Sequence, residues 1–206
     1  MTKMTEENKS VKNFLNLRFR DKNGCGFPDW KFKFGNEVFE NISNKKHNSD
    51  LPILAITQDY GAIPRDLIDF KITVTDKSVE SYKVVEVGDF IISLRSFQGG
   101  IEYSEYRGIC SPAYIILRPS ISIDRIFFKY YLKTPKYITH LNRKLEGIRD
   151  GKMISYSYFS DIILPIPSIE EQNKISAFLS HVDKRIQTQK KIIEQLKTLM
   201  KVNREK

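Results

Sequence analysis

The most regular alternation of apolar and polar positions lies in the C-terminal part of the chain. Apolar side chains recur there at alternating steps of four and three residues through about four heptads, without proline or glycine. This spacing is typical of the seam along which the helices of a coiled coil meet. The predicted seam consists of Ile175, Leu179, Val182, Ile186, Gln189, Ile193, Leu196 and Met200.

The start of this helix is marked by Pro165-Ile166-Pro167 and by the S-x-x-E sequence that begins at Ser168. In that form the serine caps an amide of the first turn and the glutamate bonds back to the cap. A helix to about Lys201 would be on the order of 50 Å long. Burial on its own domain is the usual fate of an amphipathic helix, but this length and strict spacing favour a partner. Gln189 is either tolerated at the rim or fixes the register.

Between Phe27 and about residue 167 the pattern is different, because short apolar or β-branched runs alternate with glycine and proline. Such runs predict strands, whereas a longer periodicity at about Asp124 to Leu145 predicts a helix. With 40% hydrophobic and 12% aromatic residues, a packed core is expected. The fold class is therefore α+β, a mixed α/β domain followed by a long C-terminal coiled-coil helix. The clearest strand runs are residues 51–56, 82–85, 89–92 and 114–117.

The first 26 residues are polar and show no sustained periodicity, so we expect a loosely held leader there. No apolar core of a secretory signal is present, and no stretch approaches about 18 uninterrupted apolar residues. The two cysteines, Cys25 and Cys110, lack the spacing of a zinc site. These features predict a soluble protein of the reducing cytoplasm without a membrane partner.

Charge adds a preference for a polyanionic partner, since 34 Lys and Arg against 25 Asp and Glu leave a net charge of +9. Two stretches, residues 57–65 and 93–103, combine glycine with amide, hydroxyl and arginine groups. Arginine and glutamine suit base edges, while Ser, Tyr and Lys suit phosphates. From composition alone, both stretches could equally be ordinary polar hairpin loops.

Catalytic patterns are missing from the sequence. Residues 147–153 come nearest to a phosphate-binding loop, but they lack one spacer residue and the Ser or Thr after Lys152. No base-methylation motif is found, and His47, His140 and His181 stand alone. We therefore expect no catalytic residue, metal ion or cofactor in this chain.

The junction at residues 164–175, with Phe178-Leu179 and Val182-Asp183 after it, resembles the conserved junction of type I restriction-modification specificity subunits. Three upstream segments also resemble one branch of the family's recognition domains, so the resemblance covers about Phe27 to Met200. A full subunit of this family has two recognition domains and two spacer helices, whereas this chain has one of each. The upstream segments are residues 88–93, 108–114 and 147–152.

The resemblance implies a non-catalytic, half-size subunit with a leader at 1–26, a DNA target-recognition domain at 27–167 and a conserved spacer helix at 168–206. Such helices pair antiparallel and dock methyltransferase subunits that carry S-adenosylmethionine. Restriction subunits, which use ATP and Mg²⁺, would join indirectly. The other half of the assembly is a second copy of this chain or another half-size subunit. A homodimer would recognise an interrupted palindrome.

Individual DNA contacts are expectations from side-chain chemistry. Arg95 and Gln98, with Ser96 and Tyr103 beside them, are expected at the base-reading loop. Two rival interpretations are a truncated decoy that binds methyltransferase subunits without addressing a site, and a self-sufficient nuclease or methyltransferase, which the missing motifs disfavour. The expected phosphate contacts are Lys45, Lys46, Arg65, Arg107, Arg149 and Lys152.

Overall fold

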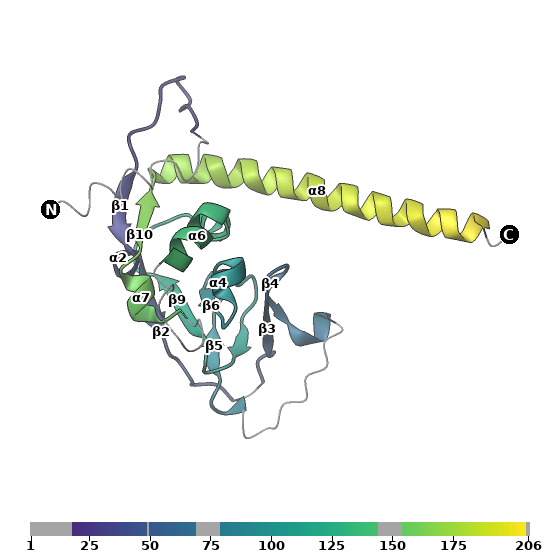
Figure 1. The fold of residues 1–206 in the computed structure, drawn as a ribbon, viewed down its shortest axis with the longest axis horizontal. Helices are drawn as coiled ribbons and strands as arrows, with labels where there is room; N and C mark the ends of the chain where they lie inside the picture. Colours follow the sequence, from purple (N-terminus) through teal and green to yellow (C-terminus); the bar gives the residue numbers. More distant parts are fainter. Residues whose placement is uncertain (1–17, 49, 69–78, 144–153, 205–206) are drawn as a thin grey trace.

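The computed structural model describes residues 18–48, 50–68, 79–143 and 154–204. Figure 1 shows a mixed α/β body and one long helix, α8 (Ile169–Arg204), which starts on the body and extends well beyond it. This arrangement confirms the expected fold class and the expected projecting helix. Within the described residues, no helix combines the length and the apolar character that a membrane span needs.

A four-stranded antiparallel sheet forms the centre of the body. Its order is β2 (Phe39–Ile42), β9 (Ile115–Pro119), β6 (Phe90–Ile92) and β7 (Glu102–Tyr103). All three residues of β6 are buried, which explains why this strand is a continuous apolar run instead of an alternating one. The strands expected at residues 89–92 and 114–117 are therefore confirmed as the centre of the sheet.

Three smaller antiparallel sheets surround the central one. One of them pairs β1 with β10, and so joins the beginning of the body to the segment just before α8. The strand expected at residues 51–56 is confirmed as part of a tight hairpin, and the one at 82–85 as part of a third pair. The pairs are β1 (Lys31–Phe34) with β10 (Ile163–Ile166), β3 (Leu54–Thr57) with β4 (Gly61–Pro64), and β5 (Lys83–Val85) with β8 (Gly108–Cys110).

The single helix expected at about Asp124 to Leu145 is wrong, because the structure has two helices there. Asp124 caps the first, and its carboxylate accepts from two amides of the opening turn. The second starts at a proline, which suits a first helical position but cannot continue a helix. Shorter helices complete the body. The helices are α5 (Arg125–Tyr131), α6 (Pro135–Arg143), α2 (Gly35–Val38), η1 (Arg65–Leu67), α4 (Ser96–Gly99) and α7 (Tyr156–Ser160).

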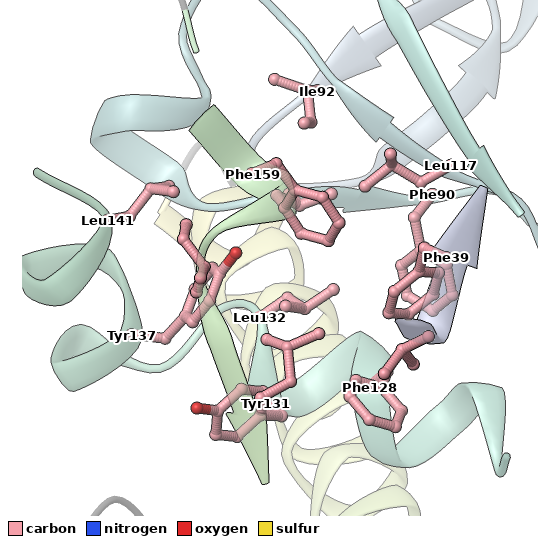
Figure 2. Close-up of a cluster of buried hydrophobic side chains, with 14 of the residues drawn as sticks. Phe39, Phe90, Ile92, Leu117, Phe128, Tyr131, Leu132, Tyr137, Leu141 and Phe159 are labelled. Atoms are coloured by element: carbon pink, nitrogen blue, oxygen red, sulfur yellow. The ribbon is translucent and has the colours of Figure 1, made fainter. Parts of the chain in front are cut away.

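Aromatic rings dominate the core between the sheet and the helices (Figure 2). The ring of Phe39 lies 5.2 Å from that of Phe90, 5.5 Å from Phe128 and 5.9 Å from Phe159, each in an edge-to-face arrangement. These contacts join β2, β6, α5 and α7, and edge-to-face pairs add to the stabilisation from burial. Ile175 of α8 is fully buried in the same core. The first turns of α8 are therefore part of the domain.

The N-terminal end of α8 is fixed by a buried carboxylate. The Ser168 hydroxyl accepts from the Glu171 amide at 3.3 Å, as expected of the cap. The second half of the expected capping box is wrong, because the Glu171 side chain accepts instead from Arg18 Nε and Trp30 Nε1, each at 2.8 Å. Glu171 is fully buried, so these donors satisfy a charge that water cannot reach.

Part of the expected leader is docked on this end of α8. The Phe19 ring packs edge-on against Phe178, and Lys174 Nζ donates to the Arg20 carbonyl at 2.8 Å. Residues 18–20 thus contact the helix, while residues 1–17 lie outside the described residues. The helix direction relative to the body is set by contacts from both ends of the domain.

Candidate nucleic-acid interface and partner helix

The two stretches with base-reading chemistry, residues 57–65 and 93–103, lie against one another. A Cβ atom on Gly99 would stand 2.6 Å from the Gln58 side chain, and one on Gly61 would stand 2.7 Å from the Tyr103 carbonyl oxygen. Gly61 also has a positive φ of 69° at the start of β4. These close approaches require glycine, which explains the glycines that mark both stretches in the sequence.

Lys133 lies where these loops meet the end of α5. Its Nζ is 2.6 Å from the Glu102 carboxylate and 2.9 Å from the Gln58 carbonyl oxygen. Glu102 is only 2% exposed, and burial raises its pKa to about 7 even though Lys133 lowers it. Lys133 and Glu102 therefore hold the β3–β4 turn beside β7, and neither was predicted as a site residue.

The expected base-reading residues differ in exposure. Arg95 and Gln98 are exposed on the loop around α4. Ser96 is 1% exposed, and its hydroxyl accepts from the Ser93 amide at 2.8 Å. Tyr103 is half-buried, with Lys129 Nζ 5.5 Å from its ring centre. Arg95 and Gln98 are thus accessible to a ligand as the loop stands, and Ser96 supports the loop.

A basic cluster surrounds Tyr114. Lys83 Nζ donates to the Tyr114 carbonyl at 2.7 Å. Burial raises the pKa of the Tyr114 hydroxyl, and the nearby Arg65 and Arg95 guanidinium groups oppose that rise. Burial also lowers the pKa of Lys83, with Lys45 close enough to lower it further. The structure therefore brings three of the expected DNA contacts, from three separate segments, into one positively charged region.

The remaining expected phosphate contacts are more dispersed. Lys46 is exposed beside Lys45, and Arg107 is exposed and paired with Glu86 at 3.2 Å. Nε and Nη1 of Arg65 are buried and have no hydrogen-bond partner within the described part of the chain. Arg149 and Lys152 lie outside the described residues, as does the rest of the stretch 147–153.

A pocket of about 490 Å³, here called the corner pocket, lies between the β3–β4 turn, β7, α5 and α8. Both charged and aromatic side chains line it, and α8 contributes two of the lining residues. Its polar lining and its position at the root of the projecting helix separate it from the basic cluster. The lining residues are Gln58, Asp59, Tyr60, Gly61, Ile63, Glu102, Tyr103, Glu105, Tyr106, Lys129, Tyr130, Lys133, Asp183 and Gln187.

The predicted seam of α8 is divided into two parts. Ile175 is fully buried and Leu179 is partly buried against the same core, so these two residues, here called the inner seam, are used within the chain. Beyond the half-buried Val182, the seam emerges from the domain into solvent. Ile186 is 47% exposed and Met200 is 59% exposed. The outer seam, which also includes the exposed Gln189, Ile193 and Leu196, lacks any covering segment among the described residues.

The described residues bring no group of three His, Cys, Asp or Glu side chains together in a way that could hold a metal ion. The described residues present a loop surface, a basic cluster and an apolar helix face. These features are suited to binding.

Residues 28–198 match the family model described as the type I restriction modification DNA specificity domain. The match covers most of the chain, and the chain belongs to this family. The family's specificity subunits are non-catalytic and hold no cofactor of their own. The resemblance noted at the junction around residue 168 is thereby confirmed.

Among known proteins, the chain is 26% identical to the MjaX specificity subunit of a type I restriction enzyme of Methanocaldococcus jannaschii, over 84% of this chain and 41% of that protein. Its fold is similar to the HsdS subunit of Thermoanaerobacter tengcongensis, with a TM-score of 0.52, 20% identity and coverage of 92% and 46%. The fold is also similar to a structure concerning complex assembly and conformational transition of the type I R-M system. The TM-score is 0.55 at 20% identity, over 92% of this chain and 47% of that chain. The chain spans less than half of each relative.

Proposed function

We propose that this chain recognises one half of a bipartite DNA target and completes the target by pairing with a second copy of itself through α8. The observation that carries the proposal is the outer seam, in which Ile193 and Leu196 are 50% and 53% exposed on a helix whose inner seam is buried. Regularly spaced apolar side chains on a projecting helix favour a helical partner.

Two copies related by a two-fold axis present identical recognition domains to inverted half-sites, so the expected target is an interrupted palindrome. Antiparallel pairing, which the family resemblance implies, sets the two domains at opposite ends of the paired helices. Methyltransferase subunits with S-adenosylmethionine would dock on this assembly in the cytoplasm and methylate adenine after flipping the base. Restriction subunits, with ATP and Mg²⁺, would act on unmethylated DNA.

The experiment that tests this proposal combines two measurements on the chain co-purified with its cognate methyltransferase subunit. The mass of the complex gives the number of copies of each chain, and methylome sequencing of the producing cells gives the target. Two copies of this chain and an interrupted palindrome support the proposal. A single copy, bound to methyltransferase subunits without sequence-specific methylation, supports the decoy alternative instead.

On the DNA side, we assign base contacts to the exposed loop around α4 and phosphate contacts to the basic residues around it. Arg95 and Gln98 have the donors and acceptors that match guanine and adenine edges. Lys45, Lys46, Arg65 and Arg107 are the phosphate contacts of the described residues. Arg149 and Lys152 remain assigned from the sequence. Ser96 supports the loop from its buried position, and the half-buried Tyr103 lies on β7 beside the β3–β4 turn.

Arg95→Ala is expected to reduce discrimination between the target and a singly substituted duplex by about 1 to 3 kcal/mol, because one two-pronged base contact is lost. Binding of the complex to both duplexes at several salt concentrations measures this loss. Lys46→Ala is the matched control, and it should weaken binding to every duplex and reduce the salt dependence. Equal weakening of all duplexes by Arg95→Ala would show that Arg95 contacts phosphate.

A further inference from the structure

The corner pocket has an acidic balance within a basic protein. Its lining contains four carboxylates, Asp59, Glu102, Glu105 and Asp183, and two lysines. Both lysines are already used, because Lys129 pairs with Glu105 and Lys133 pairs with Glu102, each at 2.6 Å. No ion pair neutralises Asp59 or Asp183 among the described residues. The pocket therefore favours a cation and disfavours the phosphates of DNA.

Asp183 is the residue through which α8 contributes charge to this pocket. The Tyr130 hydroxyl donates to Asp183 Oδ2 at 2.8 Å, which directs the carboxylate toward the domain. Asp183 follows Val182, so it occupies the e position of its heptad, beside the seam. It lies one turn before Ile186, where the outer seam begins. The pocket and the outer seam thus form one continuous surface at the root of the helix.

The e positions after Asp183 are all basic. Counting by sevens along the sequence gives Lys190, Lys197 and Arg204. In an antiparallel pair of helices, e positions lie beside e positions of the other helix, and charges there set orientation and partner choice. Asp183 therefore faces a basic residue in every antiparallel heptad register that pairs it with an e position after it. In a parallel pair, Arg185 at a g position would instead face Lys190 of the second copy, which is repulsive.

Burial of the inner seam selects among these registers. Because Ile175 and Leu179 are used within the domain, the segment from Val182 to Met200 remains available. When this segment pairs with itself, Val182 lies opposite Met200 of the second copy. Lys197 of the second copy then lies beside Asp183. Lys190 lies beside Lys190 of the second copy near the two-fold axis, where both exposed ammonium groups can turn into solvent.

We propose that the corner pocket binds the Lys197 side chain of a second copy of this chain. The ammonium group pairs with Asp183 and the carboxylates around it, while the aliphatic stem lies along the pocket's tyrosine rings. Among the described residues of the single chain, Lys197 has an exposed contact with Glu194 at 3.9 Å, which such a pairing can replace. Each recognition domain is then held by the partner helix as well as by its own. This inference rests on the proposed homodimer.

The test is a charge exchange in the full chain, with dimer dissociation constants measured by sedimentation equilibrium. Asp183→Lys and Lys197→Asp each create a like-charge pair twice per dimer, so each should raise the dissociation constant roughly tenfold or more. The double variant restores opposite charges and should return to within about threefold of the original value. Tyr130→Phe reports the effect of losing the bond to Asp183 alone, without a change of charge.

Lys191→Glu is the matched control for Lys197→Asp, because it changes the charge by the same amount and sign at an f position, away from the seam. Its dissociation constant should equal that of the unaltered chain. Lys197 is 66% exposed, so Lys197→Asp keeps the test valid if Asp183→Lys fails to fold. Unchanged single variants, or a double variant as weak as the singles, overturn the pocket assignment while the dimer stands. An unaltered chain that is monomeric at every concentration overturns the homodimer itself.

Discussion

We expect Leu196→Glu to convert the proposed homodimer into a folded monomer. Leu196 is 53% exposed in the single chain, so the substitution removes few contacts from the domain. In the paired helices the same position lies in the seam. Each copy contributes one glutamate, so two glutamates are buried in every dimer. Burying unpaired charges costs several kcal/mol each, so the dissociation constant should rise by roughly 100-fold or more. Sedimentation velocity across a concentration series measures it.

The controls separate pairing from folding. Lys191→Glu makes the same residue at an outer position of the helix and should leave the dimer intact. Ile175→Ala, within the inner seam, should cost about 2 to 5 kcal/mol of folding stability, because Ile175 is fully buried. Thermal unfolding of Leu196→Glu should remain close to that of the unaltered chain diluted below its dimer dissociation constant, where neither protein is stabilised by pairing. A Leu196→Glu protein that stays dimeric would place the dimer interface elsewhere.

Methylation of DNA in the producing cells should be lost in the monomeric variant and kept in the dimeric control. A monomer presents one recognition domain, so cells with Leu196→Glu should lose methylation of the interrupted palindrome although the protein still folds. Lys191→Glu should methylate normally. Methylation that persists with a monomeric variant would mean that a single recognition domain, or a different partner, is sufficient for the reaction.

For the seam of α8, the sequence predicts the helix but not which of its turns are buried on the domain. Its spacing and the cap at Ser168 predicted a long helix, and the structure has one. The same spacing could not tell which turns are covered by the domain, because burial on a core and pairing with another helix both use apolar residues on one face. The division after Leu179 depends on where α5 and the aromatic core lie, which is a tertiary property.

Other differences have separate physical causes. The break between α5 and α6 had a local signal that we overlooked, since Thr134 and Pro135 form a cap and a first helical residue. Glu171 matched a capping motif, but in the folded protein its carboxylate accepts hydrogen bonds from Arg18 and Trp30 instead of from the helix cap. The meeting of residues 57–65 and 93–103 has no local signal, because it results from the β4–β7 neighbourhood in the folded body.

Lys133 and Glu102 were not predicted either, because their contact is also tertiary and has no local signal. Their pairing should have a large effect on folding stability. Lys133→Met leaves the Glu102 carboxylate buried without its cation and takes a donor from the Gln58 carbonyl. Breaking a buried pair in this way typically costs about 3 to 5 kcal/mol. We expect about 2 kcal/mol at pH 8, below this range, because the unpaired Glu102 carboxyl can take up a proton and the Lys133 side chain is 29% exposed. Urea unfolding at fixed protein concentration measures the change.

The size of this effect should depend on pH, since burial raises the pKa of Glu102 from 4.5 to about 7. Between these values the folded state holds a proton that the unfolded state has released, so Glu102 makes the protein less stable as pH rises toward 7. At pH 5 Glu102 is neutral in the folded protein, and Lys133→Met should cost under about 1 kcal/mol. Above pH 7 the carboxylate is charged in the unaltered chain, whereas loss of Lys133 raises the Glu102 pKa further, so the cost of Lys133→Met grows with pH by up to about 1.4 kcal/mol per pH unit.

The double variant Glu102→Gln with Lys133→Met isolates the charge. It has no ionisable group at this position, so its stability at pH 8 should exceed that of Lys133→Met, and its dependence on pH between 4.5 and 7 should be weaker than in the unaltered chain. An equal loss from Lys133→Met at pH 5 and pH 8 would mean that Lys133 acts through packing alone. The β3–β4 turn would then be held by the close contact of Gly99 with Gln58 rather than by the buried ion pair.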